Sequence, residues 1–258
     1  MALQNDAKLK TVLNDWLPQT VATSAWLNSL GVSRQLARHY STHHWIEPLG
    51  SGAFKRPHDR VEWFGAVSSL QTQLKLPVHV GAVTAMAAHG LAHYVRMEPG
   101  AELVCLFSPL NTRLPTWFTN HDWHQSVHHL KSNMLPADLG LTTTDYGNIE
   151  VAVSTPERAI LECLYLSPNK MDLVECYEIA QGLMSLRPKL MQALLEACDS
   201  VKVKRLFLYM AEKAALPVMR HLHFATINLG AGERSLGQGG VHDAKYRLTV
   251  PVELANHG

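Results

Sequence analysis

Residues 30–40, LGVSRQLARHY, decide the fold of the N-terminal part of the chain. Gly31 can take the left-handed backbone conformation that ends one helix, and Ser33 can cap the next helix, which we expect to run to about Thr42. Thr23 is a potential cap for the preceding stretch, SAWLNSL. Two short helices joined by a turn that contains glycine are typical of a helix-turn-helix.

The flanking residues predict a winged helix. Apolar residues at helical spacing between Leu9 and Leu17, just before Pro18, indicate a first helix. After Trp45 the sequence IEPLGSGAFKRP has the pattern of a β-hairpin, and a hairpin directly after a helix-turn-helix makes the wing. Residues 61–74 are then expected to form a connecting helix.

The third helix has two chemically different faces. At about 100° per residue, Leu36 and Tyr40 fall on the side that can pack against the first two helices. Arginine and glutamine carry paired donors that match guanine and adenine edges in the major groove, and other cations contact phosphates. We therefore expect this outer face to hold Arg34, Gln35, Arg38, Ser41 and Thr42, with phosphate contacts from Lys55, Arg56 and Arg60. The alternative is an ordinary charged helix surface, or a winged helix that binds protein.

Composition bounds the class of protein. The 258 residues are 47% hydrophobic and 17% charged, which is enough to bury a core. Residues 1–60 hold seven basic and four acidic side chains, net +3, whereas the remainder holds 16 basic and 18 acidic ones, net −2. The four cysteines are too widely spaced for a disulfide framework, and no apolar run approaches about 18 residues. We expect a soluble protein of the cytoplasm with no membrane contact.

The remaining sequence mixes helical and strand patterns, so the fold class is α+β: a winged helix over residues 1–75 and a larger mixed α/β domain over 76–258. The expected helices cover 81–95, with a break at Gly90, then 156–166, 174–184 and 189–214. The expected strands cover 101–109, 126–133 and 147–154, with closing strands over 221–235 and 245–254.

The stretch HDWHQSVHH is the one candidate for a metal site. A metal needs three or four ligands that converge at about 2 Å, but adjacent histidines in a strand face opposite sides. We therefore expect no metal, and a metalloenzyme that uses these histidines is the less favoured alternative. The residues are His121, Asp122, His124, His128 and His129.

Other motifs give no cofactor or catalytic site. The glycine-rich stretch NLGAGERSLGQGG lacks the Gly-Lys-Ser/Thr ending of a phosphate loop, and there is no Gly-x-Ser-x-Gly nucleophile motif. In STPERAILE, Pro156 suits the first helical position and Glu157 complements the helix dipole. Arg158 is the residue of that motif with no local structural explanation.

Four segments taken together resemble a known family. They are LGVSRQLARHYSTHHWIEPLGSGAFKR, VGAVTAMAAHGLAHYV, VAVSTPERAILECLYL, and the terminal LGAGERSLGQGG with KYRLTVPVEL. In their order and spacing the chain resembles, over nearly its whole length, the AbiEi antitoxins of the AbiE abortive-infection toxin-antitoxin systems.

The resemblance implies a non-catalytic antitoxin and autorepressor. Its winged helix would bind inverted repeats in the promoter of its own operon, and its C-terminal domain would counter a nucleotidyltransferase toxin. The family's DNA contacts would fall on Arg34, Gln35, Arg38 and Thr42, with Lys55 and Arg56 on the wing. This chain departs from a strongly basic pattern, because histidines stand where further lysines could: His39, His43 and His44. The alternative is a winged-helix regulator whose C-terminal domain senses a small ligand.

Overall fold

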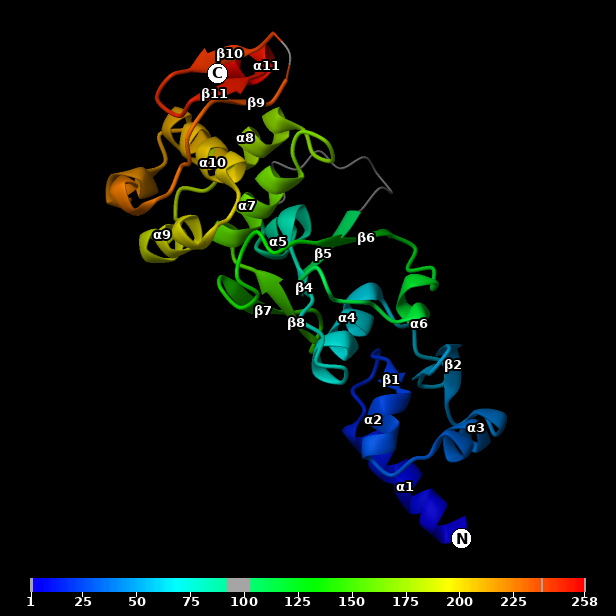
Figure 1. Ribbon diagram of the computed structural model, residues 1–258. Helices are drawn as coiled ribbons and strands as arrows, with labels where there is room; N and C mark the ends of the chain where they lie inside the picture. Colours follow the sequence, from blue (N-terminus) through cyan, green and yellow to red (C-terminus); the bar gives the residue numbers. More distant parts are fainter. Residues whose placement is uncertain (1, 92–102, 238, 258) are drawn as a thin grey trace. The chain divides into compact units, whose positions relative to one another are not determined.

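The chain has an α+β fold, as the sequence predicted. The computed structural model describes residues 2–91, 103–237 and 239–257 (Figure 1). Three small sheets are accompanied by helices along the chain, with sheet orders β1-β3-β2, β6-β5-β4-β8-β7 and β10-β11-β9. None of the helices in the described ranges is both long and apolar enough to cross a membrane.

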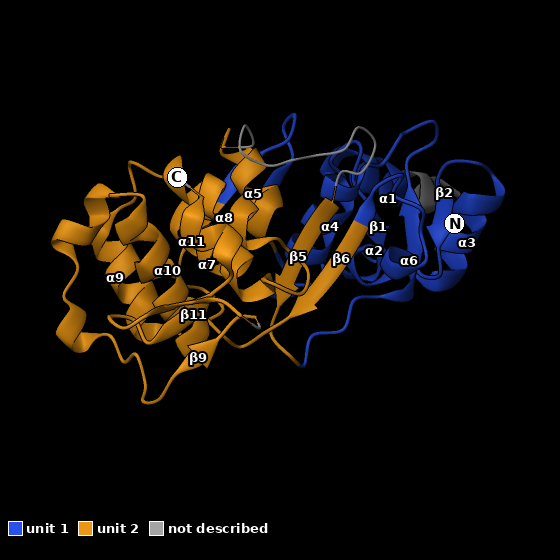
Figure 2. Cartoon of the chain, turned by 90° about the horizontal axis from the view of Figure 1, so that it is seen from above, with its two compact units in different colours: residues 1–79, 111–126, 143–152 blue, residues 80–110, 127–142, 153–258 orange. Residues whose placement is uncertain are grey.

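The chain divides into two compact units (Figure 2). Unit 1 consists of residues 1–79, 111–126 and 143–152, and unit 2 consists of 80–110, 127–142 and 153–258. The division expected from the sequence, 1–75 and 76–258, follows the chain, whereas these units are discontinuous in sequence. Unit 1 therefore combines the expected winged helix with two segments from much later in the chain.

The N-terminal residues of unit 1 form the predicted helices and hairpin. The elements are α1 (Ala2–Asp15), β1 (Ala22–Thr23), α2 (Ser24–Ser29), α3 (Arg34–Thr42), β2 (Glu47–Gly50) and β3 (Ala53–Lys55). Strand β3 pairs antiparallel with both β1 and β2. This order of three helices and a three-stranded sheet with a hairpin is a winged helix, and its wing is short.

The same unit has its own apolar core. Val12, Trp16, Leu27, Tyr40 and Ile46 are each at most 1% exposed and pack together. They come from the three helices, from the residue after α1 and from the residue before β2, so burial of this cluster fixes α3 against α1 and α2.

The predicted connecting helix is α4 (Trp63–Thr72), and it is bonded to the early residues of unit 1. The hydroxyl of Ser69 donates to the carbonyl of Val21 at 2.8 Å, and Gln73 accepts from the amide of Thr23 at 2.9 Å. Gln71 likewise exchanges hydrogen bonds with the main chain of Ala152. The helix thus joins the winged helix to a segment of unit 1 that lies some eighty residues later.

The strands of the five-stranded sheet follow the expected positions, with two strands that the sequence did not predict. The elements are β4 (His79–Val80), β5 (Leu103–Ser108), β6 (Ser126–Lys131), β7 (Leu141–Asp145) and β8 (Glu150–Ser154), with β4 parallel to β8. The short helix α6 (Thr116–Thr119) belongs to unit 1. The first two residues of the expected strand over 101–109 and the last four of the expected helix over 81–95 lie outside the described residues.

Unit 2 is built on helices around an apolar core. They are α5 (Ala82–Ala88), α7 (Pro156–Leu166), α8 (Leu173–Gln181), α9 (Pro188–Ala197) and α10 (Val201–Lys213). Helix α5 ends at Ala88, with His89 as its C-cap residue before the left-handed Gly90, so the helix breaks where the sequence predicted. The expected single helix over 189–214 is wrong, because it breaks at Cys198–Ser200, where the Ser200 hydroxyl accepts from the amide of Val203 and caps α10.

The predicted closing strands are mostly wrong. Residues 221–235 contain the last residue of η2 (Pro217–His221), then η3 (Phe224–Thr226) and only the short β9 (Arg234–Ser235). Residues 245–254 give β11 (Leu248–Val250) and then α11 (Val252–Asn256). Strand β10 (Val241–Asp243) was not predicted. The buried guanidinium of Arg205 explains the irregular backbone, because it donates to the carbonyls of Leu229, Gly230, Gly232 and Arg247. The glycine-rich stretch is therefore held by a structural arginine.

Candidate nucleic-acid interface

Helix α3 begins where the sequence predicted. Gly31 has a φ of 76°, which a residue with a side chain rarely adopts, and it ends the turn after α2. The hydroxyl of Ser33 accepts from the amide of Leu36 at 3.2 Å and so satisfies one of the free donors of the first turn. These two residues set the direction in which α3 leaves the turn.

The two faces of α3 are separated as expected. Tyr40 is fully buried and Ala37 is 4% exposed, whereas Arg34, Gln35 and Arg38 are exposed. Thr42 is exposed and its hydroxyl donates to the carbonyl of Arg38 at 2.9 Å, while Ser41 is half-buried. Among the described residues nothing forms an ion pair with Arg34 or Arg38, and the helix contains no acidic residue. The outer face therefore offers two guanidinium groups and an amide to a partner.

The wing lysine is engaged within the hairpin. The ammonium of Lys55 lies 2.7 Å from the carboxylate of Glu47 on the paired strand, and it also donates to the main-chain carbonyl of Asp59 at 3.0 Å. The hydrogen bond from Lys55 lowers the pKa of Glu47. The charge of Lys55 is thus largely compensated by the carboxylate of Glu47 within the hairpin.

The two other predicted phosphate-contacting arginines have different environments. The guanidinium of Arg56 donates to the carbonyls of Leu13 and Trp16 at the end of α1, so its donors are directed at the winged helix itself. Arg60 lies 2.7 Å from the carboxylate of Glu62, but its side chain is 76% exposed. The structure therefore does not bring Lys55, Arg56 and Arg60 together as a free cationic wing.

An aromatic cluster occupies the C-terminal end of α3. The rings of His39 and His43 have centroids 4.1 Å apart, and the ring of His43 lies 5.4 Å from that of Trp45. His39 and His43 are exposed, as is His44. Two of the histidines that stand where lysines could, His39 and His43, thus contribute ring contacts at the end of the helix.

The histidines of residues 121–129 do not converge. His124 pairs with Asp122 at 3.5 Å, whereas His129 bonds the hydroxyl of Ser108 at 2.7 Å and its neighbour His128 is exposed. Within the described ranges no group of three or more potential ligands is placed to hold a metal ion. The structure thus provides no observation that favours the metalloenzyme alternative.

The arginine of the STPERAILE motif is explained by unit 2. Arg158, 5% exposed, donates to Glu162 at 2.8 Å and to the carbonyls of Pro136 and Leu139 at 2.6 Å. The carboxylate of Glu162 also accepts from the amide of Ala82 at 3.0 Å and from the hydroxyl of Ser154 at 2.8 Å. This buried network joins α7 to α5 and β8, so the motif is structural.

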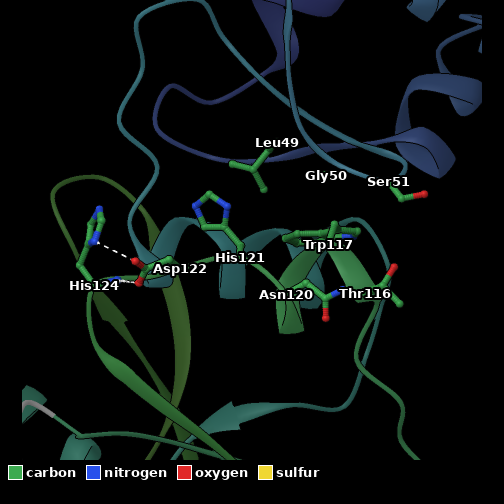
Figure 3. Close-up of a pocket in the computed structure, with 9 residues that line it drawn as sticks. All are labelled: Leu49, Gly50, Ser51, Thr116, Trp117, Asn120, His121, Asp122 and His124. Atoms are coloured by element: carbon green, nitrogen blue, oxygen red, sulfur yellow. Dashed lines mark hydrogen bonds and ion pairs between the residues drawn. The ribbon is translucent and has the colours of Figure 1, made fainter.

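A polar pocket lies beside the turn of the wing (Figure 3). It has a volume of about 570 Å³ and lies within unit 1. One wall is the end of β2 and the turn after it, and the other is α6 with the loop that follows. The lining residues are Leu49, Gly50, Ser51, Thr116, Trp117, Asn120, His121, Asp122 and His124. Of these residues, the sequence indicated a possible role only for His121, Asp122 and His124, as metal ligands.

Comparison with known families decides what the chain is related to. Residues 5–97 match the family described as transcriptional regulator, AbiEi antitoxin N-terminal domain. Residues 101–251 match the family described as transcriptional regulator, AbiEi antitoxin, Type IV toxin-antitoxin system. The chain belongs to the AbiEi antitoxin family. The resemblance noted in the sequence is thereby confirmed.

Among solved structures, the fold of this AbiEi antitoxin is similar to that of the RV2827C protein from Mycobacterium tuberculosis. The two share 13% sequence identity with a TM-score of 0.56, over 93% of this chain and 88% of the other. At that identity the likeness concerns the fold alone. No curated protein matches the sequence at a significant level.

Proposed function

We propose that this AbiEi antitoxin binds inverted repeats in its own promoter through α3 and represses its operon. The observation that carries the proposal is the outer face of α3, where Arg34, Gln35 and Arg38 are exposed opposite the buried Tyr40. A helix that follows a tight turn and presents such donors fits the major groove, where they match the edges of guanine and adenine. Ser41 and Thr42 extend the same face.

Phosphate contacts hold the register of this complex. Arg60, being the most exposed of the three predicted cations, is available once its pairing with Glu62 opens. The ion pair of Lys55 with Glu47 must break before Lys55 can contact DNA, and the donors of Arg56 bind the carbonyls at the end of α1. We therefore assign phosphate contact to Arg60 first, then to Lys55, and assign Arg56 to packing.

The second part of the proposal is that unit 2 counteracts a nucleotidyltransferase toxin encoded beside the antitoxin. Membership of a Type IV toxin-antitoxin family supports this role, because the family description joins the regulator and the antitoxin in one chain. The proposal requires no catalysis by the chain itself and no stable complex with the toxin, which is its functional partner.

Fluorescence anisotropy with two labelled duplexes tests the DNA-binding part. One duplex carries the inverted repeats of the chain's own promoter and the other a shuffled sequence of equal length. We expect the promoter duplex to bind more tightly by a factor of about 10³ or more, with an affinity that falls steeply as salt rises. Equal affinity for both duplexes would overturn the operator-specific role.

Co-expression tests the antitoxin part. A nucleotidyltransferase gene adjacent to this one is expressed alone, with the full chain, and with an Arg34→Ala/Arg38→Ala variant. We expect both forms of the chain to restore growth equally, since neutralisation is assigned to unit 2. The absence of such a gene, or growth that depends on the two arginines, would favour a plain regulator whose C-terminal domain senses a ligand.

A further inference from the structure

Two cations of the wing already have partners within the protein, so other groups are needed to hold the DNA backbone on that side of α3. Lys55 is paired with Glu47, and Arg56 donates to the carbonyls at the end of α1. Phosphate contacts in protein–DNA complexes also come from the neutral donors of serine, threonine and asparagine. The pocket beside the turn of the wing is lined by such donors.

We infer that this pocket is a second DNA-contacting site, in which Ser51, Thr116, Asn120 and His121 bind the sugar-phosphate backbone that borders the groove entered by α3. The inference rests on the proposed function and deepens it. It adds residues of the 111–126 segment to an interface that the sequence confined to residues 34–60.

The position of the pocket relative to α3 fits this role. Strand β2 begins after a four-residue connection from the end of α3, and its last two residues line the pocket. Helix α3, the hairpin and the pocket all belong to unit 1. In helix-turn-helix complexes the segments that flank the recognition helix contact the DNA backbone and fix the register.

The pocket is rigidly joined to the hairpin. A β-carbon on Gly50 would lie 2.8 Å from the β-carbon of Trp117, so only glycine allows β2 and α6 to pack this closely. Trp117 is 5% exposed and Phe118 is 2% exposed, which anchors α6. Donors on α6 and on its following loop are thus held in place beside the wing, which reduces the entropy lost on binding.

The polar groups of the pocket are arranged in two ends (Figure 3). Ser51, Thr116 and Asn120 lie at one end, and all three are exposed. Asp122 lies at the other end, where its carboxylate accepts from the amide of His124 at 2.8 Å and pairs with the His124 ring. A phosphate would sit among the hydroxyl and amide groups, at the end of the pocket opposite Asp122.

His121 lies between the two ends. Its ring is tilted by 56° against that of Trp123, with ring centroids 4.3 Å apart. Partial burial lowers the pKa of His121, and the charges of His124 and Lys55 add to this effect although Asp122 opposes it. A neutral imidazole donates one hydrogen bond without adding charge. The site therefore contributes affinity that is independent of sequence and only weakly dependent on salt.

Charge substitution at Asn120 tests the inference in the full-length protein. The probes are the promoter duplex and the shuffled duplex, measured by anisotropy between about 50 and 200 mM salt. We expect Asn120→Asp to weaken binding to both duplexes by about tenfold through repulsion of phosphate, and Asn120→Lys to tighten it and to steepen the salt slope by about one unit.

A pair of threonines in unit 1 provides the neutral control. Thr116 lines the pocket and Thr143 does not, although both are exposed. We expect Thr116→Ala to weaken binding to both duplexes by about two- to fivefold, and Thr143→Ala to leave it unchanged. Circular dichroism melts establish that the variants fold as the wild type does.

The outcomes separate the two proposals. If the wild type binds the promoter duplex specifically but both Asn120 variants bind like the wild type, the pocket takes no part in DNA contact and the inference is wrong. If the wild type binds neither duplex, the proposed function itself fails. An effect of the Asn120 variants on the promoter duplex alone would also contradict backbone contact, since that contact carries no sequence information.

Discussion

The guanidinium group of Arg56 lies 5.8 Å from the centroid of the Trp16 ring and donates to the main-chain carbonyl of the same tryptophan. It also donates to the carbonyl of Leu13, one turn earlier. Carbonyls at the end of a helix lack partners within the helix and carry partial negative charge. Arg56 thus caps α1 from the end of the hairpin and ties the wing to the first helix.

This contact makes Arg56→Ala a test of stability. We expect the variant to lose about 1–3 kcal/mol of unfolding free energy, measured by urea denaturation, because two helix-end carbonyls and an aromatic face lose a charged donor. Its salt slope for DNA binding should equal that of the wild type. If the variant is as stable as the wild type but has a smaller salt slope for DNA binding, Arg56 contacts phosphate.

Arg38 is expected to act on specificity. Replacing Arg38 with alanine should weaken binding to the promoter duplex by about 1–3 kcal/mol, roughly 5- to 150-fold, while binding to shuffled DNA changes little. Lysine should restore only part of this loss, since it lacks the paired planar donors. Lys10→Ala, at an exposed lysine of α1, is the control. Equal losses on both duplexes would show that Arg38 contacts phosphate.

The pairing of Glu47 with Lys55 predicts a gain of affinity on removal of an acid. In the wild type the ammonium of Lys55 lies 2.7 Å from the carboxylate of Glu47. In Glu47→Gln the charge of Lys55 loses this counter-charge, and the ammonium becomes available to phosphate. We expect tighter binding to shuffled DNA and a salt slope steeper by about one unit. Adding Lys55→Ala to Glu47→Gln should abolish the gain. If Glu47→Gln has no effect, the wing lies away from the duplex.

Glu157 makes the stability of unit 2 depend on pH in the acid range. Burial by itself would raise the pKa of Glu157, but hydrogen bonds from the side chain and amide of Arg187 outweigh it and leave the pKa below the ordinary 4.5. A carboxyl whose pKa is lowered by folding stabilises the native state above its unfolded pKa, and this contribution is lost as pH falls through the folded value.

We therefore expect the melting temperature of the wild type to fall as pH drops below about 4.5. Glu157→Gln should melt at a lower temperature than the wild type at pH 7, and its melting temperature should fall less than that of the wild type on acidification. The exposed Glu150, replaced by glutamine, serves as the matched control. Parallel pH profiles for wild type and Glu157→Gln would contradict this assignment.

Substitution of Glu162 is expected to lower the free energy of unfolding far more than substitution of Glu157. It is 1% exposed and holds Arg158, Ser154 and the amide of Ala82 together. Glu162→Gln leaves a buried guanidinium without its counter-ion and should cost about 3–5 kcal/mol in chemical denaturation. Replacing Arg158 and Glu162 together by methionine should cost less than Glu162→Gln alone. A single variant as stable as the wild type would show that the ion pair is not needed.

Local signals in the sequence predicted the winged helix well. Thr23, Gly31 and Ser33 specify helix ends through their own hydrogen bonds and backbone conformations, so their neighbours suffice to place α2 and α3. The alternation of buried Tyr40 with exposed Arg38 likewise follows from helical spacing. The outer face of α3 could therefore be derived without tertiary information.

Tertiary contacts decided what the sequence did not predict. The engagement of Arg56 depends on carbonyls about forty residues earlier, and the pocket depends on α6 reaching Gly50 from a distant part of the chain. The wrong strands over 221–235 result from Arg205, whose donors hold that backbone in an irregular path. Periodicity carries no signal for such contacts.

The close fit of Gly50 against Trp117 has a consequence for anyone who wishes to transplant the specificity of this protein. A chimaera that carries only residues 1–75 would leave the hairpin without Trp117, whose main chain and β-carbon pack against Gly50, and would expose to water a surface that this residue covers. A graft that also brings residues 111–126, joined by a short linker, would keep that cover and should remain monodisperse where the shorter one aggregates.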